Sequence, residues 1–287
     1  MKRILIATNR ERAHDYFVKN IVECFPEVSF LVIRQGNAQN SLKYRLIKIF
    51  SALKLDCLFF RGSPRRLEID KFRKFKKYFN KTQIHRTIDQ FYMDINSAES
   101  EKLIQDLPCD GIIVLGGKII KPPILSLVRG FSLHLHCGIV PFYRGGTTWF
   151  SNFSFEDFNN CGFTVQALDE GIDTGAIITQ QQISIQKGDS VWDAYCKCIV
   201  AGTDALIELL NRKASNLSYG FAIAPISCKG FNHTGRFLFE RNRLRRAAKK
   251  MIAKKSTDGY AFDLVEAELP SFEHKYVVKQ KSPILKF

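Results

Sequence analysis

The chain has 287 residues, a length that suits one large domain or a large domain with a smaller companion. Hydrophobic residues make up 45% and charged residues 25%, which excludes global disorder and a fibrous repeat. No run of about 18 apolar residues and no secretory pattern is present, so we expect a soluble, cytoplasmic protein without a transmembrane segment. The eight cysteines are scattered along the chain, and we expect free thiols.

The net charge of +15 is concentrated in two segments. Residues 61–86 carry ten Lys or Arg against two acidic residues, and residues 211–287 carry sixteen against six. Such segments attract anionic partners, or they form an ordinary solvated surface. Within the second segment, residues 241–255 have the spacing of an amphipathic helix, for which docking, tRNA contact and attraction of a nucleotide-linked sugar or a membrane surface remain alternatives.

The first elements predict an α/β fold. Residues 2–8 form a short apolar run, residues 13–22 repeat apolar residues at helical spacing, and residues 28–33 form a second apolar run. This strand, helix, strand order is typical of a parallel sheet. The first turn, TNRER, lacks the glycines of a dinucleotide-binding loop, which argues against a nicotinamide or flavin site there.

Residues 41–94 have no clear pattern, and we make no assignment there. The following residues predict a helix at 97–105, a strand at 110–116, a short helix after Pro122, a strand at 132–136, a helix at 149–155, paired strands at 162–168 and 176–185, and a helix after Ser190. We therefore expect a Rossmann-like, open, mostly parallel sheet with flanking helices over residues 1–210. A basic C-terminal appendage would occupy residues 211–287.

Two histidines and one aspartate are candidates for chemistry. His134 and His136 lie two residues apart in a predicted strand, so their side chains face the same way. Asp173 lies in the glycine-flanked loop DEGIDTG and could reach them. A histidine beside a carboxylate has a defined tautomer and raised basicity, which acid–base catalysis near neutral pH requires. Each residue taken singly is also typical of an ordinary structural position.

The order of these motifs resembles the formyltransferase family that uses 10-formyltetrahydrofolate. That family has a strand ending N-x-H, then P-S-L-L-P-x-Y-R-G, G-V-T and D-x-G-x-D-x-G. The matching stretches here are residues 134–136, 137–145, 162–164 and 169–175. The family includes methionyl-tRNA, glycinamide ribonucleotide and amino-sugar N-formyltransferases. In this chain His134 stands where the family has a catalytic asparagine, and Cys137–Val140 replace P-S-L-L.

The resemblance implies a role for each matching residue. His136 and Asp173 match the family's catalytic histidine and aspartate, and His134 would replace the asparagine as a hydrogen-bond donor. The pterin of the folate would contact two loops, Leu115, Gly116, Gly117, Lys118 and Ile119 in the first and Asp169, Glu170 and Gly171 in the second. Pro141, Tyr143, Arg144 and Gly145 match the family's substrate loop.

The expected function is formyl transfer from 10-formyltetrahydrofolate to a primary amine. The amine that we expect is an anionic amino sugar linked to a nucleotide. Three alternatives stay open: a methionyl-tRNA formyltransferase, a formyl-folate hydrolase and a non-catalytic member that binds nucleic acid. We expect no metal. His134, His136 and Asp173 would also suit a two-histidine, one-carboxylate metal site, but the sequence shows no further residues to orient such ligands.

Overall fold

A computed structural model describes residues 3–36, 65–213 and 231–232 of the chain. The expected helix at 241–255, most of the expected appendage and residues 41–60 lie outside the described residues. One expected boundary lies within them. The last long helix continues to residue 213, past the boundary at 210.

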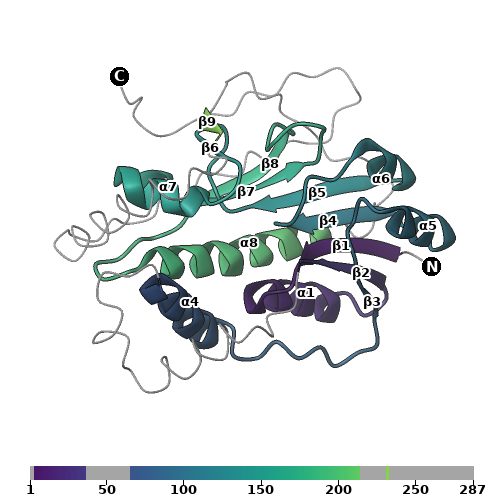
Figure 1. Ribbon diagram of the computed structural model, residues 1–287, viewed down its shortest axis with the longest axis horizontal. Coiled ribbons are helices and arrows are strands. Elements are labelled where there is room, and N and C mark those ends of the chain that lie inside the picture. Colours follow the sequence, from purple (N-terminus) through teal and green to yellow (C-terminus); the bar gives the residue numbers. More distant parts are fainter. Residues whose placement is uncertain (1–2, 37–64, 214–230, 233–287) are drawn as a thin grey trace.

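A mixed sheet with seven strands forms the centre of the described structure (Figure 1). Five neighbouring strands are parallel: β3 (Asp89–Tyr92), β2 (Ser29–Gln35), β1 (Arg3–Asn9), β4 (Gly111–Leu115) and β5 (Phe131–His136). Two further strands, β7 (Gly162–Ala167) and β8 (Ile177–Gln182), continue the sheet beyond β5 in antiparallel pairing. A separate short pair joins β6 (Tyr143–Arg144) to β9 (Phe231–Asn232). The Rossmann-like, mostly parallel sheet expected from the sequence is confirmed.

Helices cover both faces of this sheet (Figure 1). In chain order they are α1 (Arg12–Cys24), α4 (Arg65–Tyr78), α5 (Ala98–Asp106), α6 (Pro122–Leu127), α7 (Thr148–Phe155) and α8 (Val191–Lys213). A short 3-10 helix occupies Phe158–Asn160. Ser97 caps α5 by accepting a hydrogen bond from the backbone N–H of Ser100, and Pro122 begins α6, as their residue types favour.

The strands separate two hydrophobic cores because alternate side chains face opposite sides of the sheet. In β4, Ile113 packs with α1 and α8 in the larger core, whereas Ile112 packs with α5 and α6 in the other. Leu133 and Leu135 of β5 face the larger core. The intervening residues of β5, including both histidines, therefore face the opposite way at the end of the strand.

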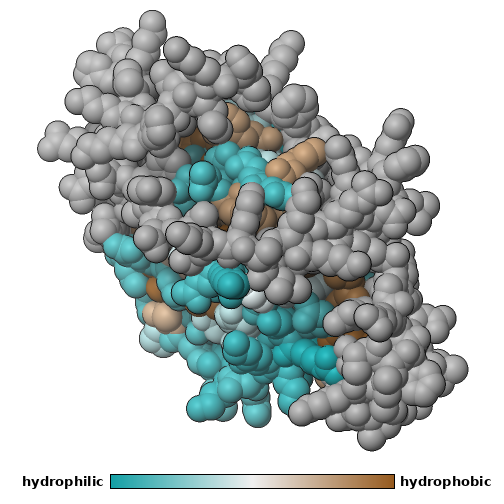
Figure 2. All heavy atoms as spheres, turned by 90° about the vertical axis from the view of Figure 1, so that its left-hand side faces the viewer, coloured by the Kyte–Doolittle hydropathy of each residue, from teal (hydrophilic) through white to brown (hydrophobic). Residues whose placement is uncertain are grey.

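The basic segment 61–86 contains a helix that the sequence analysis left unassigned. Ile69, Phe75 and Phe79 are buried on the inner side of this segment, and Phe75 stacks on Tyr195 of α8 with ring centroids 5.7 Å apart. Lys76 and Lys77 are exposed. Figure 2 views the molecule from the side where α4 lies and shows hydrophilic residues over the lower part of that face. Lys76 and Lys77 thus lie on the outer surface of a helix that packs on the core.

Candidate active site at the C-terminal edge of the sheet

A cavity of about 540 Å³ lies at the carboxyl ends of the central strands. From β1 the chain builds β2 and β3 on one side, and it then returns to build β4 and β5 on the other. Open α/β sheets bind their ligands at this kind of switch point. The cavity is lined by residues from the ends of β1, β4 and β5, the loops that follow them, and helices α1, α4, α7 and α8.

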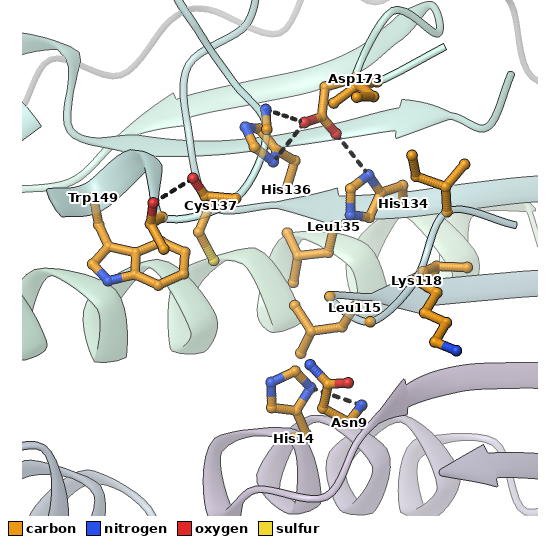
Figure 3. Close-up of a pocket in the computed structure, with 18 of the residues that line it drawn as sticks. Asn9, His14, Leu115, Lys118, His134, Leu135, His136, Cys137, Trp149 and Asp173 are labelled. Atoms are coloured by element: carbon orange, nitrogen blue, oxygen red, sulfur yellow. Dashed lines mark hydrogen bonds and ion pairs between the residues drawn. The ribbon is translucent and has the colours of Figure 1, made fainter. Parts of the chain in front are cut away.

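The Asp173 carboxylate holds the two histidines of β5 at the cavity wall, and Figure 3 shows both rings turned toward it. Its Oδ1 atom lies 3.1 Å from Nδ1 of His134, and its Oδ2 atom lies 3.4 Å from Nδ1 of His136. The Gln166 side chain donates to Oδ1 at 2.9 Å, and the backbone N–H of Gly145 donates to Oδ2 at 2.6 Å. The structure therefore brings together the three residues that the sequence singled out.

These contacts determine the charge of the carboxylate. Burial alone would raise the pKa of Asp173, but the His136 and His134 rings and the Gly145 N–H outweigh burial and hold the pKa well below its ordinary value. Burial lowers the pKa of His136, an effect that Asp173 opposes. Near neutral pH the centre thus contains a carboxylate beside a neutral, buried His136 ring.

The hydrogen-bond partners distinguish the two histidines. Nε2 of His136 lies 2.8 Å from the carbonyl oxygen of Tyr143, so both nitrogens of this ring face protein oxygens. His134 donates from Nδ1 to Asp173, which leaves Nε2 as the acceptor of a neutral ring. Within the described part of the chain, Nε2 of His134 has no hydrogen-bond partner, and the residue lines the cavity.

The first predicted folate loop lies at the cavity, as all five residues 115–119 line it. Gly116 and Gly117 have φ angles of +60° and +91°, which favour glycine. A Cβ atom on Gly117 would lie 2.7 Å from Nε2 of Gln35. That Nε2 atom is buried and has no hydrogen-bond partner among the described residues. Gln35 thus packs against the loop at Gly117, where a larger residue would collide with it.

The other predicted residues divide into two groups. Asp169, Gly171 and Gly145 line the cavity, whereas Glu170 does not. Pro141, Tyr143 and Arg144 of the predicted substrate loop also do not line it. Instead, the Tyr143 hydroxyl donates to Asp157 at 2.7 Å and its carbonyl accepts from His136. In the described structure Tyr143 thus holds the His136 ring through its carbonyl and does not line the cavity.

Several cavity residues were not identified from the sequence. His14 of α1 is buried, with Nδ1 2.6 Å from Thr8 Oγ1 and Nε2 3.4 Å from the Tyr195 hydroxyl. Desolvation by burial lowers the pKa of His14 to about 4, so the ring is neutral at pH 7. Trp149 packs against Tyr195 with ring centroids 4.4 Å apart. No short motif could reveal these residues, because they come from three separate helices.

Another part of the cavity wall combines aromatic rings with one ion pair. Lys71 of α4 lies 2.8 Å from Glu11 and 5.1 Å from the ring centroid of Trp192. Nε1 of Trp149 and Nε1 of Trp192 are buried donors without a partner in the described ranges. Flat, partly polar ligands bind well to such walls.

His134, His136 and Asp173 could also hold a metal ion, because one ligand atom from each lies within 4.8 Å of the others.

A separate feature concerns membranes. None of the helices in the described ranges combines the length and the apolar character needed to cross a bilayer.

Comparison with known proteins finds similarity to formyltransferases. A family model described as formyl transferase matches residues 78–210. Methionyl-tRNA formyltransferase from Thermosipho melanesiensis is 31% identical over 114 residues, which is 39% of this chain and 37% of that protein. The chain thus matches less than two fifths of the length of this curated relative.

Solved structures share the fold at low sequence identity. A sugar N-formyltransferase from Shewanella sp FDAARGOS_354 gives a TM-score of 0.54 at 15% identity, with 86% of this chain and 88% of that chain covered. A sugar 3N-formyl transferase in the presence of dTDP and 5-N-formyl-THF gives 0.50 at 18% identity, with 86% and 79% covered. The formyl transferase family model thus matches residues 78–210, and the two solved structures share the fold of the chain.

Proposed function

We propose that the chain transfers a formyl group from 10-formyltetrahydrofolate to a primary amine. One observation carries this proposal: the carboxylate of Asp173 contacts both His134 and His136 on the wall of a cavity that the 115–119 loop also lines. The formyl transferase domain at residues 78–210 contains all of these groups.

The folate donor would lie between the loops at 115–119 and 169–171. Gly116 and Gly117 allow a flat ring to approach the backbone. The buried Oε1 of Gln166 has no partner in the described ranges and offers an acceptor near the histidines. The folate donor supplies the formyl carbon, and its N10 atom is the leaving nitrogen.

The reaction forms a bond from the amine nitrogen to the formyl carbon and breaks the bond from that carbon to N10. One proton must move from the amine to N10. His134 suits this task, because Asp173 holds its Nδ1 proton and its Nε2 lone pair is free of protein contacts among the described residues. After taking the proton at Nε2, the ring can donate to the formyl oxygen, on which negative charge develops, or to the leaving nitrogen.

Asp173 and His136 would orient His134 and stabilise its charge. The carboxylate remains ionised near neutral pH and lies beside the ring that becomes positive. His136 is anchored through Nε2 to the Tyr143 carbonyl, so its Nδ1 is held next to Asp173 Oδ2 and helps to position the carboxylate. The role expected for His134 was donor only. The hydrogen bonds favour proton transfer by His134 instead.

We propose an amino sugar linked to a nucleotide as the acceptor. Aromatic faces such as Trp149, Trp192 and Tyr195 pack well against sugar rings and bases, and the unpaired indole N–H groups can donate to hydroxyls. Two sugar formyltransferases share the fold over 86% of the chain. The similarity to methionyl-tRNA formyltransferases favours methionyl-tRNA as the second candidate.

The test is an acceptor panel. The protein is incubated with 10-formyltetrahydrofolate and, separately, with amino sugars linked to dTDP or UDP, glycinamide ribonucleotide, methionyl-tRNA or no amine. Mass spectrometry then detects one added formyl group. We expect a formylated sugar nucleotide. Formylated methionyl-tRNA would support the second candidate, and formate released without any amine would identify a hydrolase.

A further inference from the structure

The His136 ring is held with one nitrogen facing Asp173. The Tyr143 carbonyl can only accept a hydrogen bond, so Nε2 of His136, 2.8 Å away, carries a proton. The Nδ1 atom of the neutral ring then has a lone pair that faces Asp173 Oδ2 at 3.4 Å. A cation bound beside Nδ1 would have this nitrogen and the carboxylate as neighbouring ligands.

His134 supplies a third ligand atom at the same place. Its Nδ1 atom lies 3.1 Å from Asp173 Oδ1, and the three ligand atoms are all within 4.8 Å of one another. Two ligands of a tetrahedral zinc ion, each about 2.1 Å from the metal, are roughly 3.4 Å apart. Both histidine–carboxylate distances, one to each oxygen, are close to this value, and the two rings need to approach each other by at most about 1.4 Å.

The hydrogen bonds around these ligands are those that orient metal ligands in proteins. His136 donates from its far nitrogen to a backbone carbonyl, which fixes Nδ1 as the ligand atom. Asp173 is held by the N–H of Gly145 and by the side chain of Gln166. No sequence motif indicates these partners, because two of them are backbone groups and the third lies on another strand.

We propose that His134, His136 and Asp173 bind one divalent transition-metal ion, such as Zn²⁺ or Co²⁺, and that the bound ion inhibits formyl transfer. Two imidazoles and one carboxylate favour such ions over Mg²⁺ and Ca²⁺. The adjoining cavity of about 540 Å³ leaves the remaining coordination positions open to water. An ion on Nδ1 of His134 requires the ring proton to move to Nε2, so the lone pair that would accept the proton of the amine is lost, and the ion also occupies the carboxylate.

The inhibition rests on the function proposed above, whereas the binding does not. Binding is measured on untagged protein, freed of metal by a chelator and titrated with Co²⁺ while visible absorption is recorded. We expect one Co²⁺ per chain. His134→Asn should weaken binding by about 100-fold or more, since loss of groups that merely orient ligands already costs 10- to 100-fold. His85→Asn, which changes an exposed histidine outside the cavity, is the matched control and should bind as the wild type does.

Absence of stoichiometric Co²⁺ binding to the wild type would overturn the proposal, as would equal binding by His134→Asn. X-ray absorption of the Zn²⁺-loaded wild type gives a reading that does not depend on the folding of a variant. It should show two imidazole nitrogens and carboxylate oxygen at about 2.0–2.2 Å. A shell without two imidazoles would place the metal elsewhere and contradict the assignment.

Activity measurements distinguish a failure of the proposed function from a failure of the proposed inhibition. With chelator present, the wild type should transfer formyl groups, and equimolar Zn²⁺ should suppress most of this activity. If the protein binds the metal but transfers no formyl group in the presence of chelator, the proposed function is wrong and the proposed metal site still stands. Formyl transfer that Zn²⁺ leaves unchanged would reject the inhibition.

Discussion

Nδ1 of His134 lies 3.1 Å from Oδ1 of Asp173, with one residue at the end of β5 and the other in the loop between β7 and β8. This contact fixes the His134 proton on the nitrogen that faces the carboxylate. It leaves Nε2 as the proton acceptor of the neutral ring. The arrangement matches the orientation of a general base by a carboxylate, which depends on geometry and not on fold.

Removal of the His134 ring should therefore impair proton transfer. We expect His134→Ala to lower kcat on the order of 100-fold, the usual contribution of a positioned acid–base group. Added imidazole should restore part of the activity, because it can enter the space left by the ring and carry the proton. Rate measurements with increasing imidazole test this expectation.

His134→Asn separates proton transfer from hydrogen-bond donation. An amide can donate to the formyl oxygen but cannot carry the proton, so this variant should remain at least about tenfold slower than the wild type. Wild-type turnover by His134→Asn would show that donation alone suffices. The proposed base would then be wrong.

Asp173→Asn should remove the negative charge while keeping the local backbone. Asp173 has a φ of +50°, a left-handed conformation that Asn also tolerates. We expect kcat to fall on the order of 100-fold or more, with the melting temperature changed by only a few degrees. The double variant with His134→Ala should be little slower than the slower single variant, because the two side chains act as a unit. Multiplicative losses would contradict this coupling.

Gly117→Ala should weaken binding of the folate donor. The new Cβ would lie 2.7 Å from Nε2 of Gln35 at a φ of +91°. The KM for the donor should rise more than kcat falls, because the change affects the loop and leaves the histidines in place. Gly36→Ala is the matched control, since Gly36 has a φ of +83°, open space around it and no contact with the cavity. An equal effect of both substitutions on KM would attribute the loss to backbone strain.

His14 should make the folded state sensitive to acid. Its pKa is about 4 in the folded chain against an ordinary 6.5, so below pH 6.5 the unfolded chain binds a proton that the folded chain excludes. The free energy of unfolding should fall as pH drops from about 6.5 to 4, by up to roughly 3 kcal/mol from this group. Urea unfolding at several pH values measures this loss.

The variant His14→Gln identifies the group responsible. Glutamine does not titrate, so the gap in unfolding free energy between wild type and variant should narrow as pH falls below 6.5. His85→Gln changes an exposed histidine and should leave the wild-type pH dependence unaltered. A constant gap between wild type and His14→Gln at all pH values would show that His14 does not exclude a proton.

Local patterns predicted most of the central fold. The apolar runs of β1, β2 and β4 and the capping Ser97 are contiguous signals, and the structure has strands and a helix at these places. The sequence pattern did not predict helix α4, because charged residues surround its apolar positions. Its inward face is recognisable only once Phe75 is seen against Tyr195. The sequence-based hairpin at 162–185 is confirmed, although its second strand ends at Gln182.

The site was predictable where spacing along one strand determines it. His134 and His136 share a face of β5, and Asp173 lies in a glycine-flanked loop of the same motif set. The Tyr143 carbonyl on His136 could not be predicted, since a backbone group carries no signature in the sequence. The same holds for His14 and Tyr195, which meet only through the packing of α1 on α8.

The proposed function requires that this cavity moves a formyl group to an amine with the help of Asp173. Its most direct measurement follows the consumption of 10-formyltetrahydrofolate and the formylated product together, for the wild type and Asp173→Asn, with and without a nucleotide-linked amino sugar. We predict that donor loss requires the amine, matches product one for one, and slows on the order of 100-fold or more in Asp173→Asn. Donor loss without amine, or equal rates for the two proteins, would contradict the account.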